Sequence, residues 1–148
     1  MTNFLYRFAG LLTVLLLSTG VYAEDIQVDG AWTRATTVGR DSASVFMFIT
    51  SKQDATLTGA SSTASRAVEL RTMEHKGSMM KTLVLEKIEL PANKRMDMTS
   101  IHGYHLTLTG LNAPLKAGEV VPLTLNIKTA DGKSTMIEVQ AEIKPPRK

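Results

Sequence analysis

The sequence predicts an all-β protein built as an antiparallel β-sandwich or Greek-key barrel, and three observations support this prediction. Short runs of β-branched, aromatic and alternating apolar residues recur along the chain. Polar turns that contain glycine or proline separate these runs at short intervals. No segment beyond residue 23 has the length and the 3.6-residue period of a helix. About nine short strands with this spacing are typical of sandwiches and barrels.

The first strands are expected between residues 26 and 60. Residues 26–29 alternate apolar and polar side chains, and residues 31–35 continue extended until Gly39 interrupts the pattern. Residues 44–50 combine β-branched with aromatic side chains, which indicates a buried strand. A polar turn then leads into a further strand over residues 56–60.

A tight hairpin is expected in the middle of the chain. Residues 68–73 are extended, Lys76-Gly77-Ser78 has the composition of a short turn, and residues 80–85 return. Later strands are expected at 88–90, 95–98, 104–109, 122–128 and 135–143. Asp131-Gly132 joins the last two as a second hairpin, because this dipeptide accepts the positive φ angles of a two-residue turn.

The two ends of the chain are expected to lie outside the folded domain. Arg7 is the only charged residue within residues 1–23, and an apolar run follows it. Val21-Tyr22-Ala23 then places small residues at the two positions that signal peptidase recognises before its cleavage site. The apolar run is shorter than the roughly 20 residues of a membrane anchor. We therefore expect a signal peptide over 1–23 that is cleaved after Ala23, a β-sandwich domain over 24–143 and a disordered tail over 144–148. With no cysteine in the sequence, bacterial lipid attachment is not expected.

The composition argues against several classes of function. The formal net charge is only +3, and the Lys and Arg residues are scattered, which argues against nucleic acid as a partner. Aromatic residues are too few to form stacking platforms for bases. No glycine-rich phosphate loop or nucleophile elbow is present, so no enzyme activity is expected. The exported domain is not expected to span a membrane.

The most informative segment for function runs from Met73 to His105. It contains all three histidines and five methionines, in a chain without cysteine. Thioether sulfur and imidazole nitrogen suit Cu(I), because a soft cation prefers soft donors. The alternative is that methionine serves here as a flexible filler of irregular cores. The segment therefore predicts Cu(I) as a bound ion.

Several segments resemble the periplasmic copper chaperones called PCu(A)C, the DUF461 family. They are Ala31-Trp32-Thr33-Arg34-Ala35, Thr58-Gly59-Ala60-Ser61-Ser62, Val68-Glu69-Leu70, Gly103-Tyr104-His105-Leu106, Leu108-Thr109-Gly110-Leu111, Pro114-Leu115-Lys116-Ala117-Gly118-Glu119 and Val121-Pro122-Leu123-Thr124-Leu125. The likeness extends from about Ile26 to Ile143 in the family's order. It implies a cupredoxin-like β-sandwich, export to the periplasm, and Cu(I) carried toward the copper centre of a respiratory cytochrome oxidase.

The copper ligands that the resemblance implies are mostly replaced in this chain. The family places His or Met after a Glu-Leu pair, a Met eleven residues later, and then a His-x-Met. Here Arg71, Thr82 and Thr107 stand at three of these positions, and His105 alone is retained. The resemblance therefore predicts the fold while leaving the usual site incomplete.

Other donors lie close to the replaced positions. Strand alternation places Met73 and His75 on the face of Arg71, and it places Met80 on the face of Thr82. Met73 and Met80 are each displaced by two residues from a lost ligand, which is about 6.6 Å of strand. A relocated Cu(I) site is predicted to draw its ligands from His105, Met80, Met73 and His75.

Two functions follow, and the sequence leaves both open. The first is a periplasmic copper(I)-binding, chaperone-like protein that carries or buffers copper for cytochrome oxidase assembly through a modified Met/His site. The alternative is a metal-free module of the same fold that docks on a respiratory oxidase subunit or another copper-handling protein. Convergence of the four donors would support copper, whereas Arg71 paired with Glu69 in their place would support the metal-free module.

Overall fold

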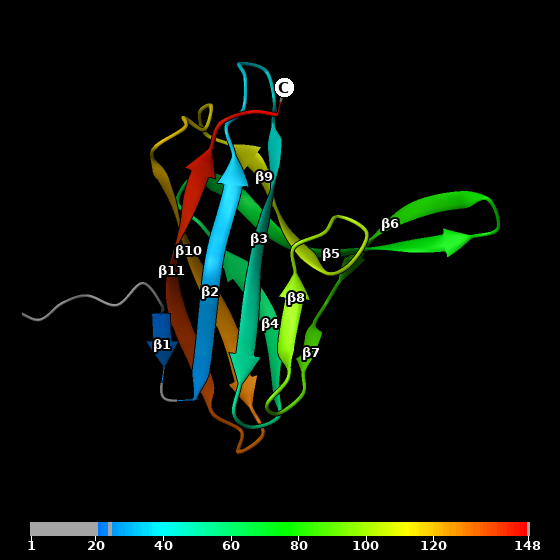
Figure 1. Ribbon diagram of the computed structural model, residues 1–148, viewed down its shortest axis with the longest axis vertical. Coiled ribbons are helices and arrows are strands. Elements are labelled where there is room, and N and C mark those ends of the chain that lie inside the picture. The colour runs from blue at the N-terminus through cyan, green and yellow to red at the C-terminus, as the bar shows by residue number, and fades with distance from the viewer. Residues whose placement is uncertain (1–20, 24, 148) are drawn as a thin grey trace, which may run out of the picture.

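The computed structural model describes residues 21–23 and 25–147, whose strands form a sheet that closes on itself into a barrel (Figure 1). The strands are β1 (Val21–Ala23), β2 (Ile26–Arg34), β3 (Ser42–Ser51), β4 (Ala55–Ser61), β5 (Ser65–Lys76), β6 (Met79–Leu85), β7 (Ile88–Leu90), β8 (Arg95–Met98), β9 (His105–Leu111), β10 (Val120–Thr129) and β11 (Ser134–Lys144). The described residues contain no helix, and the all-β prediction is confirmed.

Seven strands form the closed ring, in the order β2-β11-β10-β4-β5-β9-β3, and β3 pairs back with β2. Each neighbouring pair is antiparallel except β2 and β11, which run parallel. The sequence predicted an antiparallel sandwich or Greek-key barrel, and this single pair departs from that pattern. Strand directions cannot alternate all the way round a ring with an odd number of strands, so one parallel pair is required.

The core lies inside the ring and is filled by alternate residues of each strand. On β10, Val121, Leu123, Leu125 and Ile127 are buried, and their neighbours are more exposed, as the two-residue period of a strand requires. Met47, Met96 and Met98 are also buried in this core. These three methionines are therefore packing residues, in line with the alternative reading of the methionine content.

Strand β2 is a single strand with a bulge, where the sequence suggested two extended segments. Its register with β3 shifts between Asp29 and Trp32, and Gly30 has a φ of 59°. Glycine adopts this positive φ without the steric cost of a side chain, so it suits the bulge position. Beyond the bulge, Trp32 pairs with Phe46 of β3.

The predicted hairpin at 76–78 is confirmed and forms an arm that projects from the barrel (Figure 1). Up to Arg71, β5 pairs with β9 in the barrel wall. Beyond Arg71, the register connects β5 only to β6. We call residues 72–83 the arm. The second predicted hairpin, at Asp131-Gly132, is confirmed between β10 and β11.

The predicted signal peptide falls mostly on residues 1–20, which lie outside the described residues. Val21–Ala23 form β1, which pairs with the start of β2 and is not part of the closed ring. At the other end, β11 continues to Lys144, and Arg34 donates a hydrogen bond to the carbonyl of Pro145 at 3.0 Å. Across the described part of the chain, no helix is long and apolar enough to cross a membrane.

Candidate functional site

The arm carries three of the four predicted metal ligands on one face. His75 lies directly opposite Met80 in the register of β5 and β6, and Met73 lies two residues before His75 on the same strand. Residues opposite each other have Cβ atoms about 4.5–5.5 Å apart, and diagonal neighbours are about 7–8 Å apart. His75 and Met80 are exposed, while Met73 is half-buried. One imidazole and two thioethers therefore share a small, open region of the arm.

His105 lies apart from these three residues, in the barrel wall. Its register partner on β5 is Arg71, so Arg71 lies between His105 and the donors of the arm. The residue is only 4% exposed, and its Nδ1 atom lies 3.0 Å from the carbonyl oxygen of Gly103. A carbonyl only accepts, so Nδ1 donates the proton, and in the neutral ring Nε2 keeps its lone pair. The Nε2 atom of His105 thus has a lone pair that could bind a metal, but the cationic Arg71 is its neighbour.

Arg71 forms an ion pair with Glu69 at the position where the family resemblance implies a copper ligand. The Nε atom of Arg71 donates to Oε2 of Glu69 at 2.8 Å, and Nη2 lies 2.6 Å from the same oxygen. The guanidinium has no lone pair to offer a metal, and its charge repels a metal cation. This is the arrangement that the metal-free hypothesis expects at Arg71.

Threonines occupy two other positions of the implied ligand set, in different surroundings. Thr107 is 4% exposed, and its Oγ1 atom has no hydrogen-bond partner within the described residues. Its register partners are Glu69 on β5 and Ser44 on β3. Thr82 is exposed on β6, directly opposite Met73. Thr107 thus has a buried, unsatisfied hydroxyl, whereas Thr82 is open to solvent.

A copper site with three side-chain ligands would need methionine sulfur in the described part of the chain. Within residues 21–23 and 25–147, no three His, Asp or Glu side chains gather as a metal-binding group. Met79 is 72% exposed, but it pairs with Lys76 and so lies on the opposite face of the arm from Met80. Met96 is buried in the core. Of the methionines in this segment, only Met73 and Met80 therefore lie on the face of the arm that carries His75.

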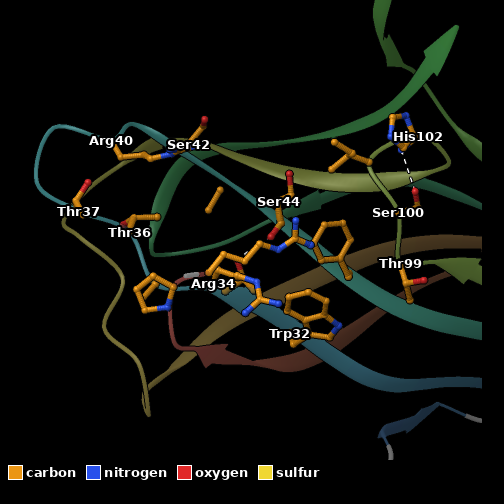
Figure 2. A pocket seen from close by; sticks show the side chains of 17 residues that line it. Trp32, Arg34, Thr36, Thr37, Arg40, Ser42, Ser44, Thr99, Ser100 and His102 are labelled. Atoms are coloured by element: carbon orange, nitrogen blue, oxygen red, sulfur yellow. Dashed lines mark hydrogen bonds between the residues drawn. The ribbon is translucent and has the colours of Figure 1, made fainter. Parts of the chain in front are cut away.

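A cavity of about 680 Å³ lies beside β2 and β3 (Figure 2). No feature of the sequence predicted it. Its lining includes four basic side chains, from Arg34, Arg40, His102 and Arg147. They come from three parts of the chain, residues 32–46, 99–102 and 146–147, so no short sequence motif contains all of them. Trp32 and Phe46 also line the cavity, with ring centroids 4.7 Å apart. Phe46 lies between the cavity and His105 in the barrel wall, since its ring centroid is 6.4 Å from that of His105.

Comparison with known proteins identifies similar sequences among bacterial lipoproteins. Residues 26–142 match the model of a family described as "Putative lipoprotein LpqE-like". A curated relative, "Putative lipoprotein Lxx21020" of Leifsonia xyli subsp. xyli, is 29% identical over 121 residues. That alignment covers 81% of this chain and 71% of the relative.

Comparison with solved structures identifies copper-protein domains of the same fold. The apo PCuAC domain from PmoF1 has a TM-score of 0.67 at 16% identity, covering 86% of this chain and 99% of that domain. The copper-bound PCuAC domain from PmoF2 has a TM-score of 0.65 at 19% identity, covering 86% and 98%. The solution structure of CuI-DR1885 from Deinococcus radiodurans is 32% identical with a TM-score of 0.54, covering 78% and 75%. The predicted cupredoxin-like fold is thereby confirmed.

Proposed function

This chain belongs to the LpqE-like family and has a PCuAC-like fold, and we propose that it is a periplasmic copper(I)-binding, chaperone-like protein. On this proposal it carries or buffers Cu(I) for cytochrome oxidase assembly, with the ion held on the arm. Two solved relatives are described with copper or CuI, which supports the ion. Relatives named as lipoproteins, a class of exported protein, support export.

The observation that supports the ion-binding role is the register of the arm. His75 opposite Met80, with Met73 on the same face, provides a nitrogen and two sulfur donors for a soft cation. The site is open, since two of these three side chains are exposed. An open set of thioethers allows a receiving protein to approach and to replace the ligands one at a time. Such exchange is what carrying or buffering requires.

His105 has a conditional place in this proposal. Its Nε2 lone pair is available, but Arg71 stands between it and Met73 on the same face. His105 joins the site only when Arg71 leaves Glu69 and turns to solvent. The proposed resting site therefore uses Met73, His75 and Met80, and His105 is a fourth donor for a rearranged state.

A Cu(I) competition titration against a chromophoric chelator, under reducing conditions, tests the proposal on protein expressed from the full sequence. We expect one-to-one binding that is lost in Met73→Leu/Met80→Leu and weakened in His75→Ala. Met79→Leu is the matched control, because Met79 is exposed on the other face of the same arm. His105→Ala is expected to change the affinity less than His75→Ala. Equal losses in Met79→Leu, or no competition by the wild type, contradict the proposal.

The Arg71–Glu69 ion pair favours a second candidate, a metal-free docking module. On this reading, the fold is retained as a surface for an oxidase-assembly partner, and the exposed arm supplies the contact. The same titration separates the candidates. A wild-type protein that leaves all Cu(I) on the chelator, while remaining folded by circular dichroism, supports the docking module.

A further inference from the structure

The cavity beside β2 and β3 is separate from the arm and has the dimensions of a ligand site. It lies between the end of β2, the loop that follows it, the start of β3, residues 99–102 and residues 146–147. Figure 2 shows Arg34 over Trp32 in the middle of the cavity, with Arg40 toward one end and His102 toward the other. Its volume of about 680 Å³ falls within the range of small-molecule pockets.

The charge of the lining has one sign. Arg34, Arg40 and Arg147 line the cavity, and no Asp or Glu lines it among the described residues. The ion pairs within 4.0 Å in the described part of the chain are Arg71–Glu69 and Lys87–Glu89, neither of which involves these arginines. Three arginines therefore line a shared space to which no Asp or Glu of residues 25–147 contributes. An anion in that space would reduce their mutual repulsion.

Arg34 is held in place by groups that leave part of its guanidinium free. Its Cζ atom lies 5.0 Å from the centroid of the Trp32 ring, and its Nη1 atom donates to the carbonyl of Pro145 at 3.0 Å. The Nζ atom of Lys144, a residue that does not line the cavity, lies 4.6 Å from the centroid of the same ring. A stacked guanidinium is already oriented, so it loses little freedom when its remaining N–H groups meet an oxyanion.

Hydroxyl groups around the cavity provide further donors. Ser100 Oγ accepts a hydrogen bond from the backbone N–H of His102, and Thr36 Oγ1 accepts one from the backbone N–H of Leu115. Each hydroxyl still has its own hydrogen to donate. Ser42, Ser44 and Thr37 also line the cavity, as does Thr99, whose hydroxyl donates to Asp97. The lining thus combines cations with neutral donors, which suits a ligand rich in acceptor oxygens.

We infer that this cavity is an oxyanion site that binds a phosphate group, either on a soluble small molecule or on a lipid headgroup. A phosphate is favoured over a carboxylate because three arginines line the same cavity, Arg34 and Arg40 from one stretch of chain and Arg147 from another. A carboxylate has two oxygens, which a single forked guanidinium satisfies, whereas a phosphate group offers three terminal oxygens to several guanidinium groups.

The test uses isothermal titration calorimetry with pyrophosphate and sedimentation with vesicles, on protein expressed from the full sequence. Vesicles of phosphatidic acid, whose phosphomonoester headgroup has three terminal oxygens, with phosphatidylcholine are compared with vesicles of phosphatidylcholine alone. The main variant is Arg40→Gln/Arg147→Gln, in which both replaced residues are exposed. The matched control is Lys128→Gln/Lys133→Gln, which removes the same charge from exposed positions at the β10–β11 hairpin.

We expect wild type and control to bind at least one probe, and we expect the arginine variant to bind it at least about tenfold more weakly. Binding of pyrophosphate identifies a soluble phosphate source, and binding restricted to the phosphatidic acid vesicles identifies a headgroup. Arg34→Lys keeps the positive charge but loses the planar guanidinium, which can donate two parallel hydrogen bonds, so this variant is expected to weaken binding as well. Binding of neither probe by the wild type, or equal weakening in the control, would overturn the inference.

Discussion

Arg71 lies directly opposite His105 in the register between β5 and β9, and its guanidinium is bonded to Glu69 on its own strand. The one residue retained from the family's implied ligand set therefore faces a cation that is already paired. On the arm side of Arg71, Met73, His75 and Met80 share the same face. Arg71 thus marks a boundary between an incomplete family site in the barrel wall and a new group of donors on the arm.

Restoring the ligands that the family resemblance implies is expected to create a strong copper site around His105, where the barrel wall meets the base of the arm. The triple variant Arg71→His, Thr82→Met and Thr107→Met supplies an imidazole and two thioethers near His105 and removes the opposing charge. We expect its Cu(I) affinity to exceed that of the wild type by at least about tenfold, measured by chelator competition. Arg71→Gln with Thr82→Leu and Thr107→Leu is the control, because it has similar bulk without thioether or imidazole. An equal gain in this control would show that removing the charge was sufficient.

Replacing the buried hydroxyl of Thr107 is expected to stabilise the barrel. Its Oγ1 atom has no hydrogen-bond partner in the described part of the chain, and the residue is 4% exposed. Thr107→Val replaces the hydroxyl with a methyl group, so the free energy of unfolding is expected to rise by roughly 1 kcal/mol. Thr33 is the matched control, because it is fully buried and its hydroxyl donates to the carbonyl of Ser44 at 2.7 Å. Thr33→Val is expected to lower that free energy by about 1–2 kcal/mol. Urea denaturation measures both, and two changes of the same sign would refute this account.

Gly110 is expected to tolerate no side chain. Its φ is +68°, and a Cβ atom built there would lie 2.8 Å from the Cβ of Arg66. Gly110→Ala is expected to lower the free energy of unfolding by roughly 2 kcal/mol or more, because strain and a clash add together. Gly59→Ala is the control, since a Cβ there would meet only Asn126 Nδ2, at an ordinary 3.7 Å. Thermal melting compares the two variants, and a larger loss at Gly59 would count against the explanation.

Most strands were predictable from the sequence because their signals are local. Residues 88–90 and 95–98 coincide with β7 and β8, and Gly77-Ser78 forms the turn expected from its composition. The ring closure was not predictable in the same way. The parallel pairing of Trp32 with Glu142 joins strands from the two ends of the domain, and no local pattern encodes it.

The candidate sites show the same division between local and long-range information. Alternation correctly placed Met73 and His75 on the face of Arg71, and the register confirms that Met80 lies on this face as well. Strand spacing alone left open whether His105 reaches these donors, because its distance from them depends on how β9 pairs with β5. The cavity forms where residues 32–46, 99–102 and 146–147 meet in space, and for that reason no motif revealed it.

Removing the arm is expected to separate the two proposed activities. Thr72 and Leu83 are register partners, so an Asn-Gly turn that replaces residues 73–82 closes β5 onto β6 close to the barrel. The arm pairs only with itself beyond Arg71, so the free energy of unfolding is expected to change by less than roughly 1 kcal/mol. Cu(I) binding is expected to disappear, because Met73, His75 and Met80 are all removed. Binding of the phosphate probe is expected to persist, because no residue of the arm lines the cavity. Chelator competition measures Cu(I) binding and calorimetry measures phosphate binding on the same preparation. Retained Cu(I) binding would place the copper site in the barrel wall instead.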